Sequence, residues 1–338
     1  MEQEPFQQAV ANVLALAGFS GNFHLYPLAG GGNNRGFRVD IEDHLVFVKA
    51  YFQHTDDPRD RLGTEYAFSR FAWQQGLRCL PQPLAADPLN GVGLYEFIQG
   101  HRLLPHEVDS DAVQQALRFY ETLNAYKETP EAQRLNPASE ACFNIKDHVY
   151  TVEGRLQRLS TIEDASPVHR QVRDFIQGEV LETWNRVRES LFRRMKLLGI
   201  YWSSDIALHD RCISPSDFGF HNAMIQDDGR VCFFDFEYAG WDDPAKMVCD
   251  FFCQPALPVS LAYYDEMVDQ VTSNLSDPEE HLARITLLFP VYQIKWCCIL
   301  LNDFLPTDSQ RRRFAGKYDL DTQHIQLQKA QDALRQVS

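Results

Sequence analysis

The pattern of predicted secondary structure changes at Gly100, and this change is the strongest constraint on the fold. Before it, short β-like runs surround one helical segment, 58–76, which begins at a proline and ends at a glycine. An earlier segment, 4–18, also has helical spacing. The β-like runs are 24–28, 35–41, 45–52, 80–85 and 92–98. Because the strands follow one another with a single helix inserted, we expect an antiparallel sheet and not a series of βαβ units.

Beyond Gly100 the pattern is mainly helical. The predicted helices are 109–127, 168–198, 243–254, 258–274, 278–304 and 308–336, and the less regular, charged stretch 128–167 is expected to be a mobile insertion. One β-like island, 222–236, has two apolar runs around Asp227-Asp228-Gly229, which predicts a hairpin. We therefore expect an α+β fold with a small β-rich lobe, 1–98, and a larger helical lobe, 99–338.

Composition limits the partners. The net charge of −15 over 338 residues argues against nucleic-acid binding, because phosphate backbones require clustered Lys and Arg. The N-terminus lacks the basic-then-apolar order of a secretion signal, and Lys295 interrupts the apolar stretch near Leu287, so no membrane span is predicted. The eight cysteines include no Cys-x-x-Cys pair and are expected to be reduced core side chains. These features favour a cytoplasmic protein.

The segment 214–237 contains the strongest candidates for catalytic and metal-binding side chains. Ser214-Pro-Ser-Asp-Phe-Gly-Phe-His-Asn222 precedes the predicted hairpin, and Phe233-Phe-Asp-Phe-Glu237 ends it. Asp217, Asn222 and Asp235 therefore stand at the mouths of one hairpin, where their side chains can converge. Phosphoryl transfer needs such a set: a carboxylate to accept the proton of an attacking hydroxyl, and two oxygen ligands to hold Mg²⁺ against phosphates.

This segment resembles the catalytic core of the aminoglycoside phosphotransferase and choline kinase-like family, relatives of the protein kinases. The resemblance implies a two-lobed protein-kinase-like fold, Asp217 as catalytic base, and Asn222 and Asp235 as magnesium ligands. The Asp-Phe-Glu-Tyr sequence at 235–238 is similar to choline and ethanolamine kinases in particular. Asp217-Phe218-Gly219 spells the metal-binding triplet of protein kinases, but it precedes the hairpin, so the metal role is assigned to Asp235.

The N-terminal half supplies candidate nucleotide-binding residues. Gly30-Gly-Gly-Asn-Asn34, between two β-like runs, is typical of a flexible hairpin tip that can close over phosphates, and equally of a bare hairpin turn. It resembles the family's phosphate loop, which implies phosphate contacts for Gly31, Gly32 and Asn34. The Walker pattern and the dinucleotide fingerprint are both absent from this sequence.

Two charged residues in apolar surroundings also point to a nucleotide. Lys49 ends the apolar run 46–49, and Glu65 follows in the inward-facing stripe of the next helix. An ion pair between them would aim the lysine at the α- and β-phosphates, as in kinase-like families; the alternative is two surface side chains. The segment 94–100 resembles the family's hinge, which implies that backbone groups from Glu96 to Ile98 bind adenine. ATP and GTP both stay open.

The sequence departs from the family pattern at two positions. Pro215-Ser-Asp217 replaces the usual His-Gly-Asp or His-Arg-Asp, and Met247 stands where an aspartate is usual. In the family that aspartate accepts hydrogen bonds from backbone N–H groups of the catalytic loop, just before the catalytic aspartate. Pro215 has no N–H to donate. We expect Pro215 to stiffen the loop, with either Asp250 or no residue replacing the buried acceptor.

Clues to the acceptor are weaker. The residues after the metal aspartate are acidic and aromatic, which suits either an amine-binding surface or a solvated turn with one buried tryptophan. They are Glu237, Tyr238, Trp241, Asp242 and Asp243. Helix 278–304 is interpreted mostly as core, with Lys295 as a candidate substrate-facing exception.

The sequence thus predicts a Mg²⁺-dependent kinase that transfers the γ-phosphate of ATP or GTP to a hydroxyl of a sugar, aminosugar or amino alcohol. The alternative is a catalytically silent, nucleotide-binding regulatory module. A protein kinase is less favoured, because His-Arg-Asp and Ala-Pro-Glu are both missing and little room is left for an activation loop. The oligomeric state stays open.

Overall fold

The computed structural model describes residues 3–28, 34–53, 57, 59–305 and 320–337. They form two compact units, and the chain passes between them more than once. Among the described residues, the first unit holds those up to Ser139 and Phe220–Gly240, and the second holds Glu140–Gly219, 241–305 and 320–337. These units do not coincide with the predicted lobes, 1–98 and 99–338, because the predicted hairpin belongs with the N-terminal sheet. The lobe boundaries stay a prediction.

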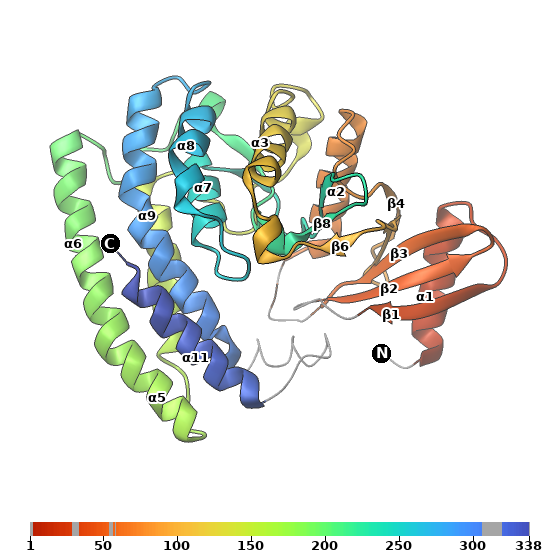
Figure 1. Ribbon diagram of the computed structural model, residues 1–338, viewed down its shortest axis with the longest axis horizontal. Coiled ribbons are helices and arrows are strands. Elements are labelled where there is room, and N and C mark those ends of the chain that lie inside the picture. The colour runs from red at the N-terminus through yellow and green to blue at the C-terminus, as the bar shows by residue number, and fades with distance from the viewer. Residues whose placement is uncertain (1–2, 29–33, 54–56, 58, 306–319, 338) are drawn as a thin grey trace. The chain divides into compact units, whose positions relative to one another are not determined.

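The first unit is built on a five-stranded sheet that is antiparallel, as predicted. Its strand order is β1-β2-β3-β5-β4. Its strands are β1 (Phe23–Leu28), β2 (Arg35–Ile41), β3 (His44–Ala50), β4 (Pro83–Asp87) and β5 (Val92–Glu96). Alternate residues of β2 are buried, as expected for a strand with one face on a core. Helix α1 (Gln3–Leu16) covers that face with Val10 and Leu14 (Figure 1).

Helix α2 (Arg61–Gln74) is the single helix inserted among these strands. It begins where the Asp60 carboxylate accepts a hydrogen bond from the Gly63 N–H at 2.8 Å, a normal N-cap. It ends just before Gly76, whose φ of +89° suits a glycine. The helix turns Glu65, Phe68 and Ala72 inward.

A small three-stranded sheet, β6-β8-β9, completes the first unit together with helix α3 (Ser110–Asn124). Its strands are β6 (His101–Arg102), β8 (Ala223–Ile225) and β9 (Val231–Phe233), and the last two form the predicted hairpin. Gly100 is required where β6 begins, because a Cβ there would lie 2.4 Å from the Ile225 carbonyl oxygen. The Gln115 side chain of α3 accepts from the Val231 N–H at 2.8 Å, which fastens the hairpin.

The second unit is helical around α9 (Pro278–Leu300), and several helices in the described part of the chain pack closely against it. These are α4 (Ile145–Leu159), α6 (Leu181–Leu198), α7 (Pro244–Cys253), α8 (Tyr264–Thr272) and α11 (Leu320–Arg335). Helix α5 (Pro167–Phe175) continues into α6 through one π-helical turn, Ile176–Val180. Strands β7 (Cys212–Ser214) and β10 (Gly240–Asp242) pair with each other.

The expectation of a mobile insertion at 128–167 is wrong. Helix α4 lies within it, and its Val149, Val152 and Leu156 are buried at helical spacing. The charged residues between them hide this apolar stripe when the stretch is judged by composition alone. Of the predicted helix 308–336, residues 320–335 are helical and 308–319 lie outside the described residues.

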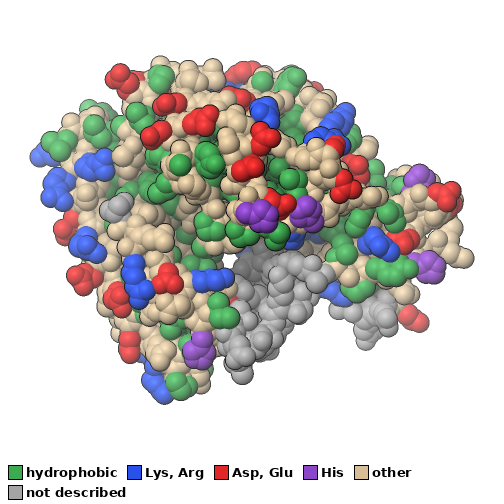
Figure 2. Space-filling model, in the orientation of Figure 1, with side chains coloured by type: hydrophobic (Ala, Val, Ile, Leu, Met, Phe, Trp, Pro, Cys, Tyr) green, Lys and Arg blue, Asp and Glu red, His purple; other side chains and the backbone are tan. Residues whose placement is uncertain are grey.

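Segment Pro278–Phe304 is long and apolar enough to cross a membrane, but it is the core helix of the second unit. Its Lys295 ammonium lies 2.7 and 2.9 Å from the two oxygens of the buried Asp250 carboxylate. The Trp296 indole N–H donates to Asp250 at 2.8 Å. Lys295 is therefore a core residue and not a substrate-facing exception. Of the two alternatives for the buried acceptor, Asp250 is excluded, because its hydrogen bonds go to α9, and the alternative that no residue replaces it stays open. On the visible face, acidic and basic side chains are mostly interspersed (Figure 2).

We expect Lys295→Met to lower the free energy of unfolding by about 3–5 kcal/mol, because it leaves the buried Asp250 carboxylate without its cation. Urea unfolding followed by tryptophan fluorescence measures the change. Lys329→Met, on the exposed face of α11, is the matched control and should stay within about 0.5 kcal/mol of the wild type. Equal stability of Lys295→Met and wild type would contradict a core role for this pair.

Candidate active site

Lys49 is the centre of the polar cluster in the first unit. It ends the apolar run of β3, is buried, and donates to Glu65 of α2 at 2.6 Å and to Asp235, which follows β9. The ion pair predicted between Lys49 and Glu65 is present, and the alternative of two surface side chains is wrong. The ammonium therefore joins a strand, a helix and the end of the hairpin.

Burial and charge set the protonation of this cluster. Burial alone would lower the pKa of Lys49, but the carboxylates of Asp235 and Glu65 outweigh it and hold the pKa well above its usual value. Burial raises the pKa of Glu65 to about 7, against the opposing effect of Lys49. The Tyr51 hydroxyl donates to Glu65 at 2.8 Å and lies 2.7 Å from the Tyr95 hydroxyl. Glu65 thus has two hydrogen-bond donors that fix its direction.

The hairpin brings Asn222 and Asp235 to one end. Ala223 pairs with Phe233, and the Phe234 N–H donates to the Asn222 carbonyl oxygen at 3.0 Å. Asp235 has a φ of +70°, in the left-handed region that non-glycine residues seldom adopt. Such strain gathers at functional sites. The Asp235 side chain is 31% exposed, so it is accessible as well as bonded to Lys49.

The donor set at this end of the hairpin suits magnesium. Asn222 and Asp235 offer hard oxygen atoms, and among the described residues no group of three or more His, Cys, Asp or Glu side chains could hold a metal alone. Mg²⁺ is typically bound by one or two protein oxygens and completed by substrate phosphates and water. These two residues therefore fit a metal that arrives with a nucleotide.

Glu237 is a buried member of this cluster that the sequence did not identify. Its carboxylate accepts from the Asn34 amide at 2.6 Å, and the Arg61 Nε lies 4.0 Å away. Burial alone would raise the pKa of Glu237, but Lys49 and Arg61 hold it below its usual value. Asn34 in turn accepts from the Phe52 N–H at 3.1 Å. The sequence signal for the burial of Glu237 is its position: it is a second acidic residue in an otherwise apolar run, two residues after Asp235.

Asn34 is the last residue of the predicted phosphate loop, two positions after Gly32. Gly31 and Gly32, the other two predicted residues of that loop, lie outside the described residues. Asn34 is buried and is joined to Glu237, so the end of the loop is fastened to the segment that carries Asp235.

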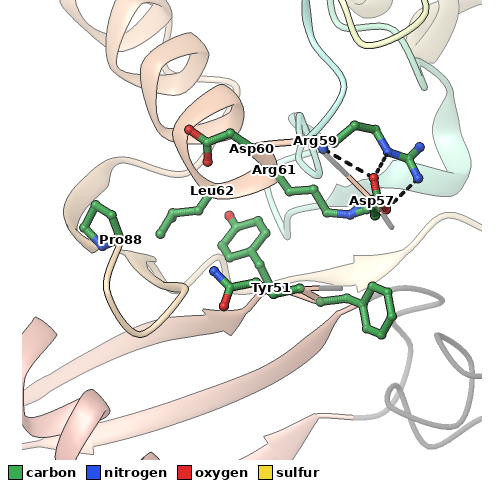
Figure 3. Close-up of a pocket in the computed structure, with 9 residues that line it drawn as sticks. Tyr51, Asp57, Arg59, Asp60, Arg61, Leu62 and Pro88 are labelled. Atoms are coloured by element: carbon green, nitrogen blue, oxygen red, sulfur yellow. Dashed lines mark hydrogen bonds and ion pairs between the residues drawn. The ribbon is translucent and has the colours of Figure 1, made fainter. Parts of the chain in front are cut away.

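A pocket of about 310 Å³ lies beside the first turn of α2 (Figure 3). It is lined by Tyr51, Phe52, Gln53, Asp57, Arg59, Asp60, Arg61, Leu62 and Pro88. Within it the Asp57 carboxylate accepts from Arg59 and from the buried Arg61, each at 2.6 Å. These bonds fix the start of α2 and hence Glu65, one turn further along.

Asp217 lies in the second unit, in a tight loop after β7. The Ser216 N–H donates to the Ser214 hydroxyl at 3.0 Å, and Ser216 has a φ of +68°. The Phe218 N–H donates to the Ser216 carbonyl at 2.7 Å, which makes a γ-turn centred on Asp217. The Ser214 hydroxyl thus accepts a backbone hydrogen bond within the loop, in which Pro215 has no N–H to donate. Asp217 itself is half-buried.

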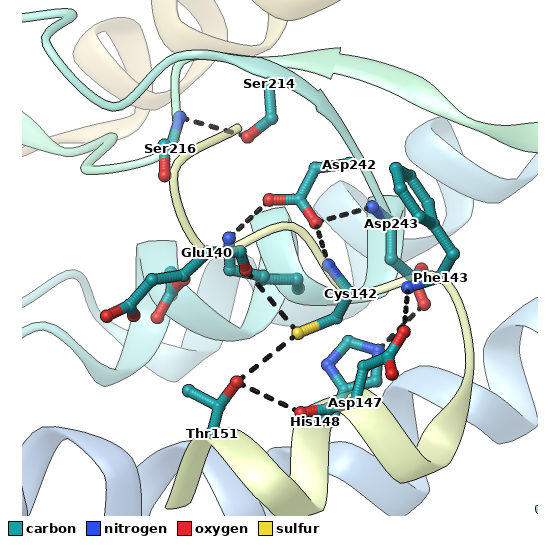
Figure 4. A network of polar contacts seen from close by, with 12 residues as sticks. Glu140, Cys142, Phe143, Asp147, His148, Thr151, Ser214, Ser216, Asp242 and Asp243 are labelled. Atoms are coloured by element: carbon teal, nitrogen blue, oxygen red, sulfur yellow. Dashed lines mark hydrogen bonds and ion pairs between the residues drawn. The ribbon is translucent and has the colours of Figure 1, made fainter. Parts of the chain in front are cut away.

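A network of buried charges holds β10, the partner of β7 (Figure 4). Asp242 accepts from the Cys142 and Asp243 N–H groups at 3.0 and 2.9 Å and pairs with Lys246. Asp243 caps α7 and accepts from Arg284 at 2.6 Å, with His148 at 3.0 Å.

Both interpretations of the acidic residues after Asp235 are therefore wrong. Glu237, Asp242 and Asp243 form neither an amine-binding surface nor a solvated turn, because all three are fully buried and paired. Asp242 and Asp243 act as scaffold, and Glu237 belongs to the Lys49 cluster.

The predicted hinge follows β5. The Glu96 N–H donates to the Gln82 carbonyl at 2.8 Å, and its carboxylate accepts from the Gln82 N–H at 3.2 Å. Ile98 is half-buried two residues later. Recognition of a nucleotide base by Glu96 and Ile98 stays a prediction.

We expect Asp243→Asn to destabilise the protein by about 2–4 kcal/mol at pH 7, because buried Arg284 loses its carboxylate. Burial alone would raise the pKa of Asp243, but Arg284 and His148 hold it well below its usual value. A carboxyl of this kind stabilises the fold above its unfolded pKa of about 3.9, and the contribution fades as the pH falls further. The difference between wild type and variant should therefore shrink below about pH 4.

Urea unfolding from pH 7 down to the lowest pH at which both proteins fold measures this difference. Asp332→Asn, in an exposed ion pair, is the control and should have little effect at any pH. A difference that stays constant with pH would contradict the assignment.

The comparisons with known proteins identify the family and the fold. Residues 24–265, well over half of the chain, match the model of the phosphotransferase enzyme family (APH). Among curated protein sequences, none is similar enough to count as a match.

Several solved structures have a similar fold. A choline/ethanolamine kinase family protein from Mesorhizobium loti has a TM-score of 0.54 at 16% identity, over 98% of this chain and 99% of that one. Choline kinase from Streptococcus pneumoniae has a TM-score of 0.58 at 14% identity, over 98% and 99%. A spectinomycin phosphotransferase bound to ADP and spectinomycin has a TM-score of 0.59 at 11% identity, over 96% and 98%.

The predicted α+β, protein-kinase-like fold is thus confirmed, and so is the resemblance that the motifs indicated. The chain belongs to the phosphotransferase enzyme family.

Proposed function

We propose that this phosphotransferase moves the γ-phosphate of ATP, or of GTP, onto a hydroxyl group of a small molecule. The observation that carries the proposal is the buried Lys49 ammonium held between Glu65 and Asp235. A lysine fixed by a helix glutamate, next to a carboxylate with oxygen donors for a metal, is the arrangement that positions a triphosphate for transfer. Membership of the family supports the same conclusion.

Residues of the first unit would bind the nucleotide. Lys49 would contact the α- and β-phosphates, aimed by Glu65, while Gly31, Gly32 and Asn34 would cover them. Backbone groups of Glu96 and Ile98 would bind the base. Asn222 and Asp235 would hold Mg²⁺, which when bound neutralises charge on the β- and γ-phosphate oxygens.

Asp217 would act on the acceptor. Its carboxylate would accept a hydrogen bond from the acceptor hydroxyl and orient the oxygen toward the γ-phosphorus. As the new O–P bond forms and the bond to the β-phosphate oxygen breaks, the hydroxyl proton passes to Asp217 and the nucleoside diphosphate leaves. The γ-turn and the Ser214 hydroxyl hold the loop in place for this step.

The acceptor class is proposed from the neighbours and the location from the cysteines. Structural neighbours include choline and ethanolamine kinases and a spectinomycin phosphotransferase, which supports a sugar, aminosugar or amino alcohol. All eight cysteines are free, which agrees with a reducing, cytoplasmic location.

A catalytically silent, nucleotide-binding module is the second candidate. Pro215 and Ser216 favour it, because they replace the His-Gly or His-Arg that usually precedes the catalytic aspartate. Such a module would bind nucleotide through the Lys49 cluster and transfer nothing.

Asp217→Asn tests the catalytic role. We expect turnover to fall by about 10²–10⁴-fold, since the general base is lost, while nucleotide affinity changes little. ADP release is measured over pools of sugars, aminoglycosides, choline and other amino alcohols, and nucleotide binding by calorimetry. Asp228→Asn, in the exposed hairpin turn, should keep wild-type turnover.

The outcomes separate the candidates. Wild-type protein that binds ATP but turns over no pool above the water background would support the silent module. Equal turnover in Asp217→Asn and wild type would remove Asp217 from the mechanism.

A reciprocal exchange tests the contact between Asn34 and Glu237. Asn34→Asp places two carboxylates in contact and should raise KM for the nucleotide by about 10–100-fold, with a smaller effect on kcat. Adding Glu237→Gln exchanges the two groups, so that the amide at 237 donates to the carboxylate at 34. The double variant then has one carboxylate at this contact, as the wild type does. The double variant should recover at least part of the loss in KM. No recovery would show that this contact does not position the nucleotide.

A further inference from the structure

The C-terminal end of α6 exposes apolar side chains that a core would normally bury. Leu197 is 81% exposed, Leu198 51% and Tyr201 76%. Earlier turns of the same helix bury Trp184 and Leu191, whereas two adjacent leucines of its last turn are exposed. Exposed apolar groups gathered in this way usually mark an interaction site.

This end of the helix has a rigid base. Gly199, with a φ of +69°, ends α6, and its N–H donates to the Met195 carbonyl. The Trp202 ring then packs against Phe192 at 5.0 Å and against Tyr150 of α4 at 6.2 Å. The backbone that carries the exposed side chains is therefore fastened to the unit on both sides and is not a loose tail.

Basic residues surround the apolar ones. Arg193, Arg194 and Lys196 are all exposed in the last turns of α6. Between 186 and 202 the sequence has five basic residues and one acidic residue, although the whole chain has a net charge of −15. Figure 2 shows basic and hydrophobic side chains together at the left edge, where α6 lies in Figure 1.

We propose that this surface, the α6 end patch, binds the surface of a membrane that contains anionic lipids. The patch consists of Arg193, Arg194, Lys196, Leu197, Leu198 and Tyr201. Leucines at a helix end can enter the boundary between headgroups and acyl chains, tyrosine and tryptophan favour that depth, and Arg and Lys attract anionic headgroups. The contact is peripheral, does not involve a membrane span, and does not depend on the proposed kinase activity.

Charge argues against the main alternative. A second copy of the chain that used the same patch across a twofold axis would bring two basic clusters together, which repel. An anionic lipid surface complements both the charge and the apolar groups. A soluble polyanion without apolar groups, such as heparin, complements the charge alone.

Vesicle flotation of the full-length protein tests the proposal. We expect binding to phosphatidylcholine vesicles that contain phosphatidylserine, weaker binding at high salt, and little binding to phosphatidylcholine alone. The triple variant Arg193→Gln/Arg194→Gln/Lys196→Gln and the double variant Leu197→Ser/Leu198→Ser should each lower the partition coefficient at least about tenfold. Leu89→Ser, at a turn in the first unit where Leu89 is 95% exposed, should bind as the wild type does.

Three results would overturn the proposal. One is the absence of binding to anionic vesicles. If the protein then binds heparin through the same basic residues, the patch is assigned to a soluble polyanion. Another is equal vesicle binding by wild type and both patch variants. The third is a dimer in analytical ultracentrifugation that the leucine double variant dissociates, which would assign the patch to a second copy. Thermal unfolding of each variant checks that it is folded.

Discussion

The shared ammonium of Lys49 is the interaction on which the first unit depends. A buried lysine is costly unless anions meet it, and here two carboxylates from different elements do so. Glu65 sets the position of α2 against the sheet, and Asp235 sets the end of the hairpin that enters from the second half of the sequence. Loss of the ammonium would leave two carboxylates close together and without a cation. The contacts that join the sheet, the helix and the hairpin therefore form together or are lost together.

The sequence predicted this centre because its signals are local and chemically unusual. A lysine in an apolar strand and a glutamate in an apolar helical stripe each violate the expected pattern, and the hairpin has a clear turn. The burial of Glu237, Asp242 and Asp243 could not be predicted in the same way. The cations that pair with them, among them Arg61 and Arg284, are distant in the sequence or stand out by no sequence pattern. Unless these partners are known, an acidic, aromatic segment is interpreted as a surface turn.

The same limit applies to Asp250 and to α4. The sequence offered Asp250 as a substitute acceptor for the catalytic loop, but its partners are Lys295 and Trp296, which only the packing of α7 on α9 brings near. Helix α4 was missed because charged residues on its outer face dominate the composition of the stretch. In both cases the deciding contact is between segments far apart in the chain.

The two units differ in how their buried acids are balanced, and this separates scaffold from candidate site. In the second unit Asp242 has Lys246, Asp243 has Arg284, and Asp250 has Lys295. In the first unit the carboxylates of Glu65 and Asp235 share the ammonium of Lys49, and Arg61 lies beside both Glu237 and Asp57. Matched pairs satisfy one another and need no ligand. A partly exposed aspartate that shares its cation with a second carboxylate is stabilised by an added cation, which supports the proposal that Asp235 binds a metal together with its nucleotide.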